Sequence, residues 1–284
     1  MTALDAPEPK PLVPGVASAL SPMVRRVLAP NPGVMTGPGT NTYLVGIDEV
    51  VVIDPGIDDV GHLDAVVGCG GDRIRWIVCT HTHPDHAPGA AALKARTGAQ
   101  VLGFESRDSL VADATMADGD RIEATEFRLR AVHTPGHASN HLCFLLEGER
   151  LLFSGDHIMQ GSTVVIAPPD GDMAAYVTSL ERLRTLRLRS IAPGHGHLIE
   201  QPLTVIDGYL AHRREREQQV LAALAGGDTT AAAIVDRLYA GLIDELVPRA
   251  RQSVHAHLRK LVADGLVTTA DADDGEGEWA LVSN

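Results

Sequence analysis

The fold of this chain is decided by seven consecutive residues, Thr80-His81-Thr82-His83-Pro84-Asp85-His86. They directly follow a predicted strand, Ile74–Cys79, and they bring three imidazoles and a carboxylate close together. Imidazole nitrogen and carboxylate oxygen are ligands that zinc and similar divalent metals prefer. His81 and His83, at alternate positions after the strand, can face one metal, and Asp85 and His86, entering the next helix, can face a second. A histidine-rich loop without function is the alternative, and four metal-competent side chains this close disfavour it.

Three further motifs carry ligand-type residues, each just after a short predicted strand. The motifs are Thr134-Pro135-Gly136-His137, Ser154-Gly155-Asp156 and Pro193-Gly194-His195-Gly196, and the strands are 127–132, 151–153 and 190–192. If the carboxyl ends of these strands share one edge of the sheets, all the ligand-type side chains converge there, where α/β folds usually place their sites. The predicted metal ligands are therefore His81, His83, Asp85, His86, His137, Asp156 and His195.

The first two thirds of the chain alternates short apolar strands with helical segments, separated by glycine and proline. This pattern predicts an α/β fold that opens with a hairpin, 41–46 and 50–54. Further predicted strands are 101–104 and 141–146, and predicted helices are 87–97 and 173–186.

The pattern changes near Asp207. Three helices are predicted at 207–225, 231–239 and 247–264, and a hairpin at 266–269 and 278–282, which is the plan of a winged helix. We therefore expect a catalytic domain at 1–206, with a proline-rich arm at 1–20, and a winged-helix domain at 207–284.

The ligand motifs, in this order, resemble those of the metallo-β-lactamase superfamily from about Asn31 to about Leu198. The resemblance implies a four-layer αββα sandwich followed by the small C-terminal winged-helix domain. It implies that His81, His83 and His137 hold one metal, that Asp85, His86 and His195 hold the other, and that Asp156 bridges the two.

The C-terminal pattern, together with Asn31-Pro32-Gly33 and Gly39-Thr40-Asn41-Thr42-Tyr43, resembles the LACTB2-like branch of that superfamily. Its animal member is a mitochondrial endoribonuclease and its fungal relatives include polyketide thioesterases, so the branch spans two chemistries. The resemblance also implies that Asn41 and His141 lie close to the substrate.

The ligand set predicts a metal-dependent hydrolase. Two cations roughly 3.5 to 4 Å apart lower the pKa of a shared water and present a metal-bridging hydroxide to the substrate. Asp85 is expected to orient that water and is the predicted catalytic residue. Zinc is the expected metal, and iron or manganese are alternatives because histidine and aspartate accept all three.

Three functions follow from these features. The first is hydrolysis of an ester or thioester of a small molecule, the second is cleavage of single-stranded RNA, and the third is a nucleic-acid-binding regulator with a sensing metal site. A basic cluster in the last predicted helix, with Arg249, Arg251, Arg259 and Lys260, favours nucleic acid. Against it, residues 213–284 carry eight Lys and Arg and twelve Asp and Glu, a net charge of -4. We therefore do not expect duplex DNA to be a partner.

Composition sets the remaining expectations. With 284 residues the chain is long enough for a large domain and a small one, and its net charge of -13 disfavours capture of nucleic acid by the whole molecule. The first 16 residues contain Asp5 and Glu8 and no apolar run, and no stretch approaches the roughly 20 apolar residues of a membrane span. We expect a cytoplasmic protein, with homodimerisation left open.

Overall fold

The computed structural model describes residues 11–282, which form two compact units. The first unit contains the described residues up to 132 together with 142–161 and 190–200, and the second contains 133–141, 162–189 and the residues from 201 onward. Half of the predicted arm, residues 1–10, lies outside the described residues. In its other half, Ser18–Ala19 forms a short strand that pairs with the next one.

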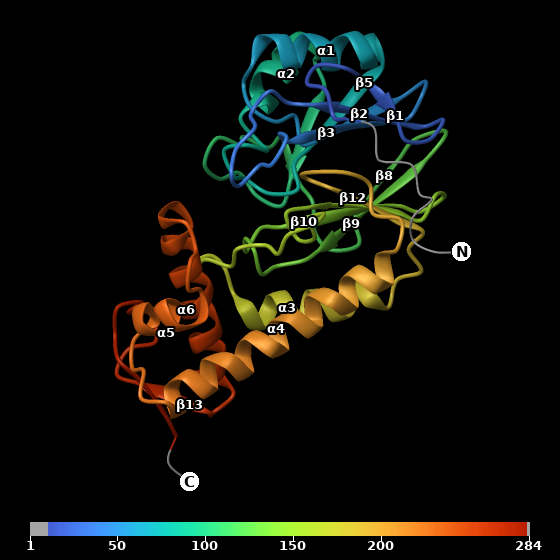
Figure 1. Ribbon diagram of the computed structural model, residues 1–284. Helices are drawn as coiled ribbons and strands as arrows, with labels where there is room; N and C mark the ends of the chain where they lie inside the picture. The colour runs from blue at the N-terminus through green and yellow to red at the C-terminus, as the bar shows by residue number, and fades with distance from the viewer. Residues whose placement is uncertain (1–10, 283–284) are drawn as a thin grey trace, which may run out of the picture. The chain divides into compact units, whose positions relative to one another are not determined.

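Two sheets make up the first unit (Figure 1). Among the described residues, the first sheet has seven strands in chain order, β1 (Ser18–Ala19), β2 (Val24–Leu28), β3 (Asn41–Val45), β4 (Val50–Ile53), β5 (Ile74–Val78), β6 (Gln100–Gly103) and β7 (Ala114–Thr115). The second sheet has the order β12 (Ser190–Pro193), β11 (Leu151–Gly155), β10 (Leu142–Leu146), β9 (Arg128–His133) and β8 (Arg121–Glu123).

The core of this unit lies between the two sheets. Successive side chains of a strand point to opposite faces, so Val51 and Ile53 of β4 join Phe144 and Phe153 of the second sheet in one buried cluster. The alternate residues of β4 point to the outer face, where they pack with helices α1 (Val60–Gly70) and α2 (Gly89–Thr97) (Figure 1). Because both faces of β4 are covered, it is apolar throughout.

The second unit is mainly helical. Its helices are α3 (Met173–Arg184), α4 (Pro202–Ala225), α5 (Ala231–Leu238) and α6 (Val247–Ala263), and β13 (Val267–Thr269) pairs with β14 (Trp279–Leu281) in an antiparallel hairpin. Asp172 and Thr230 cap α3 and α5, because each side chain accepts a hydrogen bond from a backbone N–H of the first turn. One buried core, which includes Trp279, is shared by the last turns of α4, helices α5 and α6, and the β13–β14 hairpin.

Most predicted elements lie within a few residues of the observed ones, but the short strands β1, β7 and β8 were not predicted, and three larger elements also differ. Strand β2 was not predicted because Arg25 and Arg26 interrupt its apolar pattern. Helix α1 was not predicted because it contains three glycines. Helix α4 begins at Pro202, five residues before the predicted Asp207, since proline is well tolerated in the first turn of a helix. The predicted boundary between 206 and 207 therefore falls inside this helix, and that boundary stays a prediction.

None of the helices within residues 11–282 combines the length and the apolar character needed to span a membrane.

Candidate metal centre

Two of the ligand motifs follow strands that pair in parallel, and a third is connected to the same sheet by a backbone hydrogen bond. Strands β11 and β12 pair in parallel, with Gly155 opposite Pro193, so Asp156 and His195 emerge at the same edge of the second sheet. The histidine-rich stretch follows β5, and Thr80 accepts a hydrogen bond at its carbonyl from the first residue of β10, Leu142. These contacts bring the strand ends that carry Asp156 and His195 together and connect the start of the histidine-rich stretch to β10.

The first group of ligand-type side chains contains Asp85, His86, Asp156 and His195, and each offers one atom within 4.8 Å of the others. His86 Nε2 lies 3.3 Å from Asp85 Oδ2 and 3.3 Å from Asp156 Oδ1. His195 Nε2 lies 3.2 Å from Asp85 Oδ2 and 3.3 Å from Asp156 Oδ1. Tetrahedral zinc with bonds of about 2.0–2.1 Å separates its ligand atoms by about 3.3 Å, so these spacings fit such an ion.

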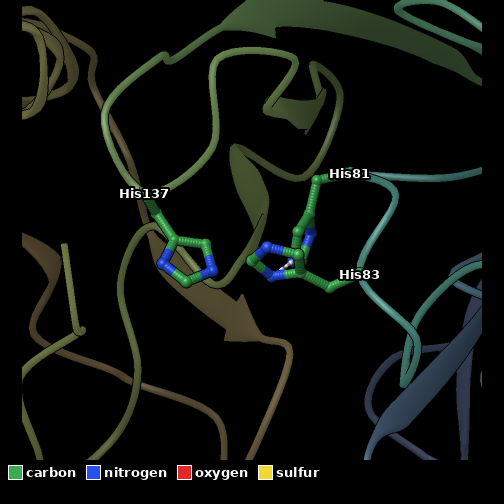
Figure 2. A group of neighbouring side chains, drawn as sticks. All are labelled: His81, His83 and His137. Atoms are coloured by element: carbon green, nitrogen blue, oxygen red, sulfur yellow. Dashed lines mark hydrogen bonds between the residues drawn. The ribbon is translucent and has the colours of Figure 1, made fainter. Parts of the chain in front are cut away.

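The second group contains His81, His83 and His137, again with one ring nitrogen each within 4.8 Å of the others (Figure 2). His81 Nε2 and His83 Nδ1 are 2.9 Å apart. Three imidazoles with converging nitrogens are a typical ligand set for zinc.

Hydrogen bonds at the ring nitrogens that face away from the group fix the orientation and the tautomer of two imidazoles. His86 Nδ1 donates to Asp54 Oδ2 at 2.9 Å, and His195 Nδ1 donates to the Gly39 carbonyl at 3.1 Å. In a neutral imidazole this leaves the Nε2 lone pair facing the group. His86 Nε2 is buried and has no hydrogen-bond partner among the described residues. A divalent cation bound by these residues would satisfy it.

Electrostatics in this group favour a cation. Burial alone lowers the pKa of His195, but the carboxylates of Asp156 and Asp85 override it and raise the pKa to about 9. Burial likewise opposes the charge on His86, and the neighbouring carboxylates raise its pKa well above the usual range. The same imidazoles hold the pKa of Asp85 and of Asp156 below the usual range although burial acts in the opposite direction. A metal would take the place of these protons.

Asp54 is a site residue that the sequence analysis missed. It follows β4 directly, its φ is 52°, and it is only 2% exposed. Its carboxylate accepts hydrogen bonds from Thr80 N at 2.7 Å, Thr80 Oγ1 at 2.8 Å and His86 Nδ1 at 2.9 Å. Asp54 therefore orients both the start of the histidine-rich stretch and one imidazole. The available signal was a lone carboxylate at the end of an apolar strand.

Asn41, predicted to lie near the substrate, is fully buried. Its Nδ2 donates to the carbonyls of Pro193 and Gly196, both at 2.9 Å. The Tyr43 hydroxyl donates to the Pro193 carbonyl at 2.7 Å, and Arg26 donates to the Gly196 carbonyl at 3.3 Å. These three side chains hold the loop that carries His195. The substrate contact of Asn41 stays a prediction, and the sequence analysis did not identify Arg26 or Tyr43.

His141 is fully buried as well. Its Nδ1 lies 2.9 Å from Thr134 Oγ1, and its backbone carbonyl accepts a hydrogen bond from Thr134 N at 2.9 Å. His141 therefore closes the base of the loop that contains His137. Its predicted contact with the substrate also stays a prediction.

Gly194 gives a first test of the geometry. A Cβ at this position would meet Asp156 Oδ1 at 2.7 Å and His86 Cε1 at 2.8 Å, too close for either atom to stay in place. We expect Gly194→Ala to weaken metal binding by about 10–100-fold, the range found when groups that support ligands are disturbed. The measurement is competition with a chelator. Gly68→Ala is the control, since its Cβ would meet nothing within 4 Å. Unchanged affinity in Gly194→Ala would contradict the site geometry.

Comparisons with known protein families agree with this geometry. Residues 35–195 match the model of the metallo-beta-lactamase superfamily, which covers all seven predicted ligands. Residues 230–279 match the model of the beta-lactamase associated winged helix domain.

Similar proteins match over most of their own length. A beta-lactamase-like protein 2 homolog of Drosophila melanogaster is 32% identical, over 93% of this chain and 96% of the relative. An atrochrysone carboxyl ACP thioesterase of Cryptosporiopsis sp. is 31% identical, over 93% of this chain and 86% of the relative. In fold, the chain is similar to the crystal structure of a beta-lactamase domain protein from Burkholderia ambifaria, with a TM-score of 0.81, 22% identity and 95% of each chain covered.

Proposed function

The chain belongs to the metallo-beta-lactamase superfamily of hydrolases, and on that premise we propose that it uses two divalent metal ions to hydrolyse a thioester or ester of a small organic acid. The superfamily fold and the winged-helix domain expected from the sequence are confirmed, as is the resemblance to the beta-lactamase-like protein 2 branch. That the chain is a hydrolase with groups of side chains suited to divalent metals follows from the same findings. The number of metals, the mechanism and the substrate are the proposal.

One observation carries the proposal, namely the group of Asp85, His86, Asp156 and His195 described above. Its two carboxylates and two imidazoles approach one another at 3.2–3.3 Å, and a buried ring nitrogen of His86 points among them. Zinc is the proposed metal for this donor set, with iron and manganese as alternatives.

When bound, two such cations supply a water of lowered pKa and polarise the substrate carbonyl. The protein's own residues hold and orient the reactants. Asp85 is the carboxylate that we propose accepts a proton from the attacking water, and its side chain is 23% exposed against 13% for Asp156, which supports this choice. Asp156, whose Oδ1 faces His86 and His195, is the proposed bridging ligand, as the resemblance to the superfamily implies.

The substrate class is supported by charge and by relatives. A net charge of -13 opposes the binding of long polyanions and is compatible with a small acyl thioester. A relative that spans nearly the whole chain is named as an acyl-carrier-protein thioesterase. We therefore propose thioester hydrolysis ahead of RNA cleavage.

Cleavage of single-stranded RNA is the second candidate, and the winged-helix domain favours it. Its basic residues are partly engaged, however. Arg259 pairs with Asp273 at 3.0 Å, and Lys260 pairs with Glu217 at 3.1 Å and with Asp264 at 2.7 Å. Carboxylates at these distances weaken a phosphate-binding surface. We do not propose duplex DNA as a partner. A homodimer and a cytoplasmic location remain predictions.

The two substrates can be compared on one metal-analysed sample. We expect turnover of an acyl thioester that is insensitive to salt and absent from Asp85→Ala, and no cleavage of a fluorescent single-stranded RNA. RNA cleavage that falls steeply between 50 and 200 mM salt, on the order of 10³-fold, would replace thioester hydrolysis by the second candidate. Metal binding without turnover of either substrate would favour the regulator with a sensing metal site.

A further inference from the structure

Residues 163–167 lie in the connection between β11 and α3, and they form neither helix nor strand. Three carbonyls in or next to this segment, those of Ser162, Val164 and Val165, accept hydrogen bonds from side chains. One of them, the carbonyl of Val165, accepts a hydrogen bond from His137 Nδ1 at 2.8 Å. Because a carbonyl can only accept, this bond places the proton on Nδ1 and leaves Nε2 as the nitrogen available to a metal.

Helix α4 binds Val164 of this segment and the preceding Ser162 through two side chains one turn apart. The Tyr209 hydroxyl donates to the carbonyl of Ser162 at 2.5 Å, and Arg213 Nη2 donates to the carbonyl of Val164 at 2.6 Å. Positions i and i+4 lie on one face of a helix, so both donors face the segment together. The carbonyl bound by Arg213 immediately precedes the one bound by His137.

Burial of the Arg213 guanidinium is expected to lower the stability of the fold. Arg213 is 3% exposed, and among the described residues no carboxylate lies within ion-pair distance of its guanidinium. The charge is compensated by the Val164 carbonyl and by the ring of Tyr176, whose centroid is 5.1 Å away. Burying a charge without a charged partner costs free energy, and an apolar side chain of similar volume often leaves stability unchanged or higher. Stability therefore does not explain why an arginine occupies this position.

A second set of contacts links Arg213 to the loop that carries His137. Tyr176, which lies under the guanidinium, packs directly against Gly136, where an added Cβ would lie 2.4 Å from Tyr176 Cα. The φ of Gly136 is 145°, a conformation that favours glycine. Arg213 thus contacts two groups that adjoin the His137 loop. Tyr176 packs against Gly136, and Val164 precedes Val165, which accepts the Nδ1 proton of His137.

We propose that Arg213 is a positioning residue that fixes the Val165 carbonyl and thereby sets the tautomer and orientation of the His137 imidazole. The inference rests on the proposed function in one respect, that His137 is a ligand of one of the two metals. Loss of Arg213 frees residues 163–167 to move, so that His137 Nδ1 no longer has a fixed acceptor.

The test compares Arg213→Met with Arg216→Met. Arg216 is on the same helix and its guanidinium also lies over a tyrosine ring, that of Tyr239 at 4.4 Å, so it is a matched control. In the metal-free protein, nitrogen NMR of the imidazoles should show His137 protonated at Nδ1 in the wild type and in Arg216→Met, and a mixture of tautomers in Arg213→Met. Chelator competition should show about 10–100-fold weaker binding of one metal in Arg213→Met, with the other unchanged.

Three results would overturn the inference. They are a wild-type tautomer in Arg213→Met, an equal loss of affinity for both metals, and the same loss in Arg216→Met. If Arg213→Met does not fold, Tyr209→Phe removes only the hydroxyl that binds Ser162, and it should shift the tautomer and the affinity in the same direction by less. A tautomer change in a protein that binds no metal near His137 would support the positioning role and contradict the proposed function.

Discussion

Replacing Asp85 by asparagine is expected to lower kcat/KM of hydrolysis by about 10²–10⁴-fold, the range that a positioned proton acceptor contributes. The amide keeps the size of the side chain but carries no negative charge, so it neither accepts the proton of the attacking water nor offsets the charge of a bound cation. The effect is measured as kcat/KM on samples of known metal content, because one metal is expected to bind more weakly as well.

Asp58→Asn is the matched control for that experiment, since Asp58 is an exposed carboxylate of the same unit. It should leave both the rate and the metal content unchanged. If Asp85→Asn kept full activity with two metals bound, Asp85 would not be the catalytic carboxylate.

Removing the carboxylate of Asp54 is expected to destabilise the fold by about 3–5 kcal/mol, as is usual when one partner of a buried ion pair is deleted. In Asp54→Ala, Thr80 N, Thr80 Oγ1 and His86 Nδ1 all lose their acceptor inside the protein. The loss is measured by urea unfolding of the metal-free protein. Metal affinity should fall as well, because the tautomer of His86 is no longer fixed.

Asp54→Asn separates the two effects. The amide oxygen can still accept a hydrogen bond from Thr80, so we expect much of the stability to return. The amide nitrogen is a donor, however, and it cannot accept the proton of His86 Nδ1. Metal affinity should therefore stay low in Asp54→Asn while stability recovers. Wild-type metal affinity in both variants would contradict the positioning role of Asp54.

The ligand-type residues could be predicted from the sequence because they are concentrated locally. Three imidazoles and a carboxylate are adjacent in 81–86, and His137, Asp156 and His195 each follow a strand that its apolar residues reveal. Parallel pairing of β11 with β12 then brings two of those strand ends together. Where ligands follow strand ends, the sequence predicts their convergence.

The residues that support the ligands were not predicted, because their partners are distant in the sequence. Asp54 binds His86 across 32 positions, and Arg26 binds Gly196 across 170 positions. Arg213 was not predicted either, since nothing in the sequence of α4 indicates that Val164 lies beside it. Local patterns identify side chains suited to a metal, whereas the shell that orients them depends on tertiary contacts.

The most direct test for two metal sites is the metal content of the purified chain, compared with that of His83→Ala and His195→Ala. Elemental analysis should find two divalent ions per wild-type chain and close to one in each variant, because the variants remove a ligand from different groups. Hydrolysis should be lost in both. A wild-type chain that binds no divalent metal, or variants that keep two ions and full activity, would contradict a two-metal hydrolase.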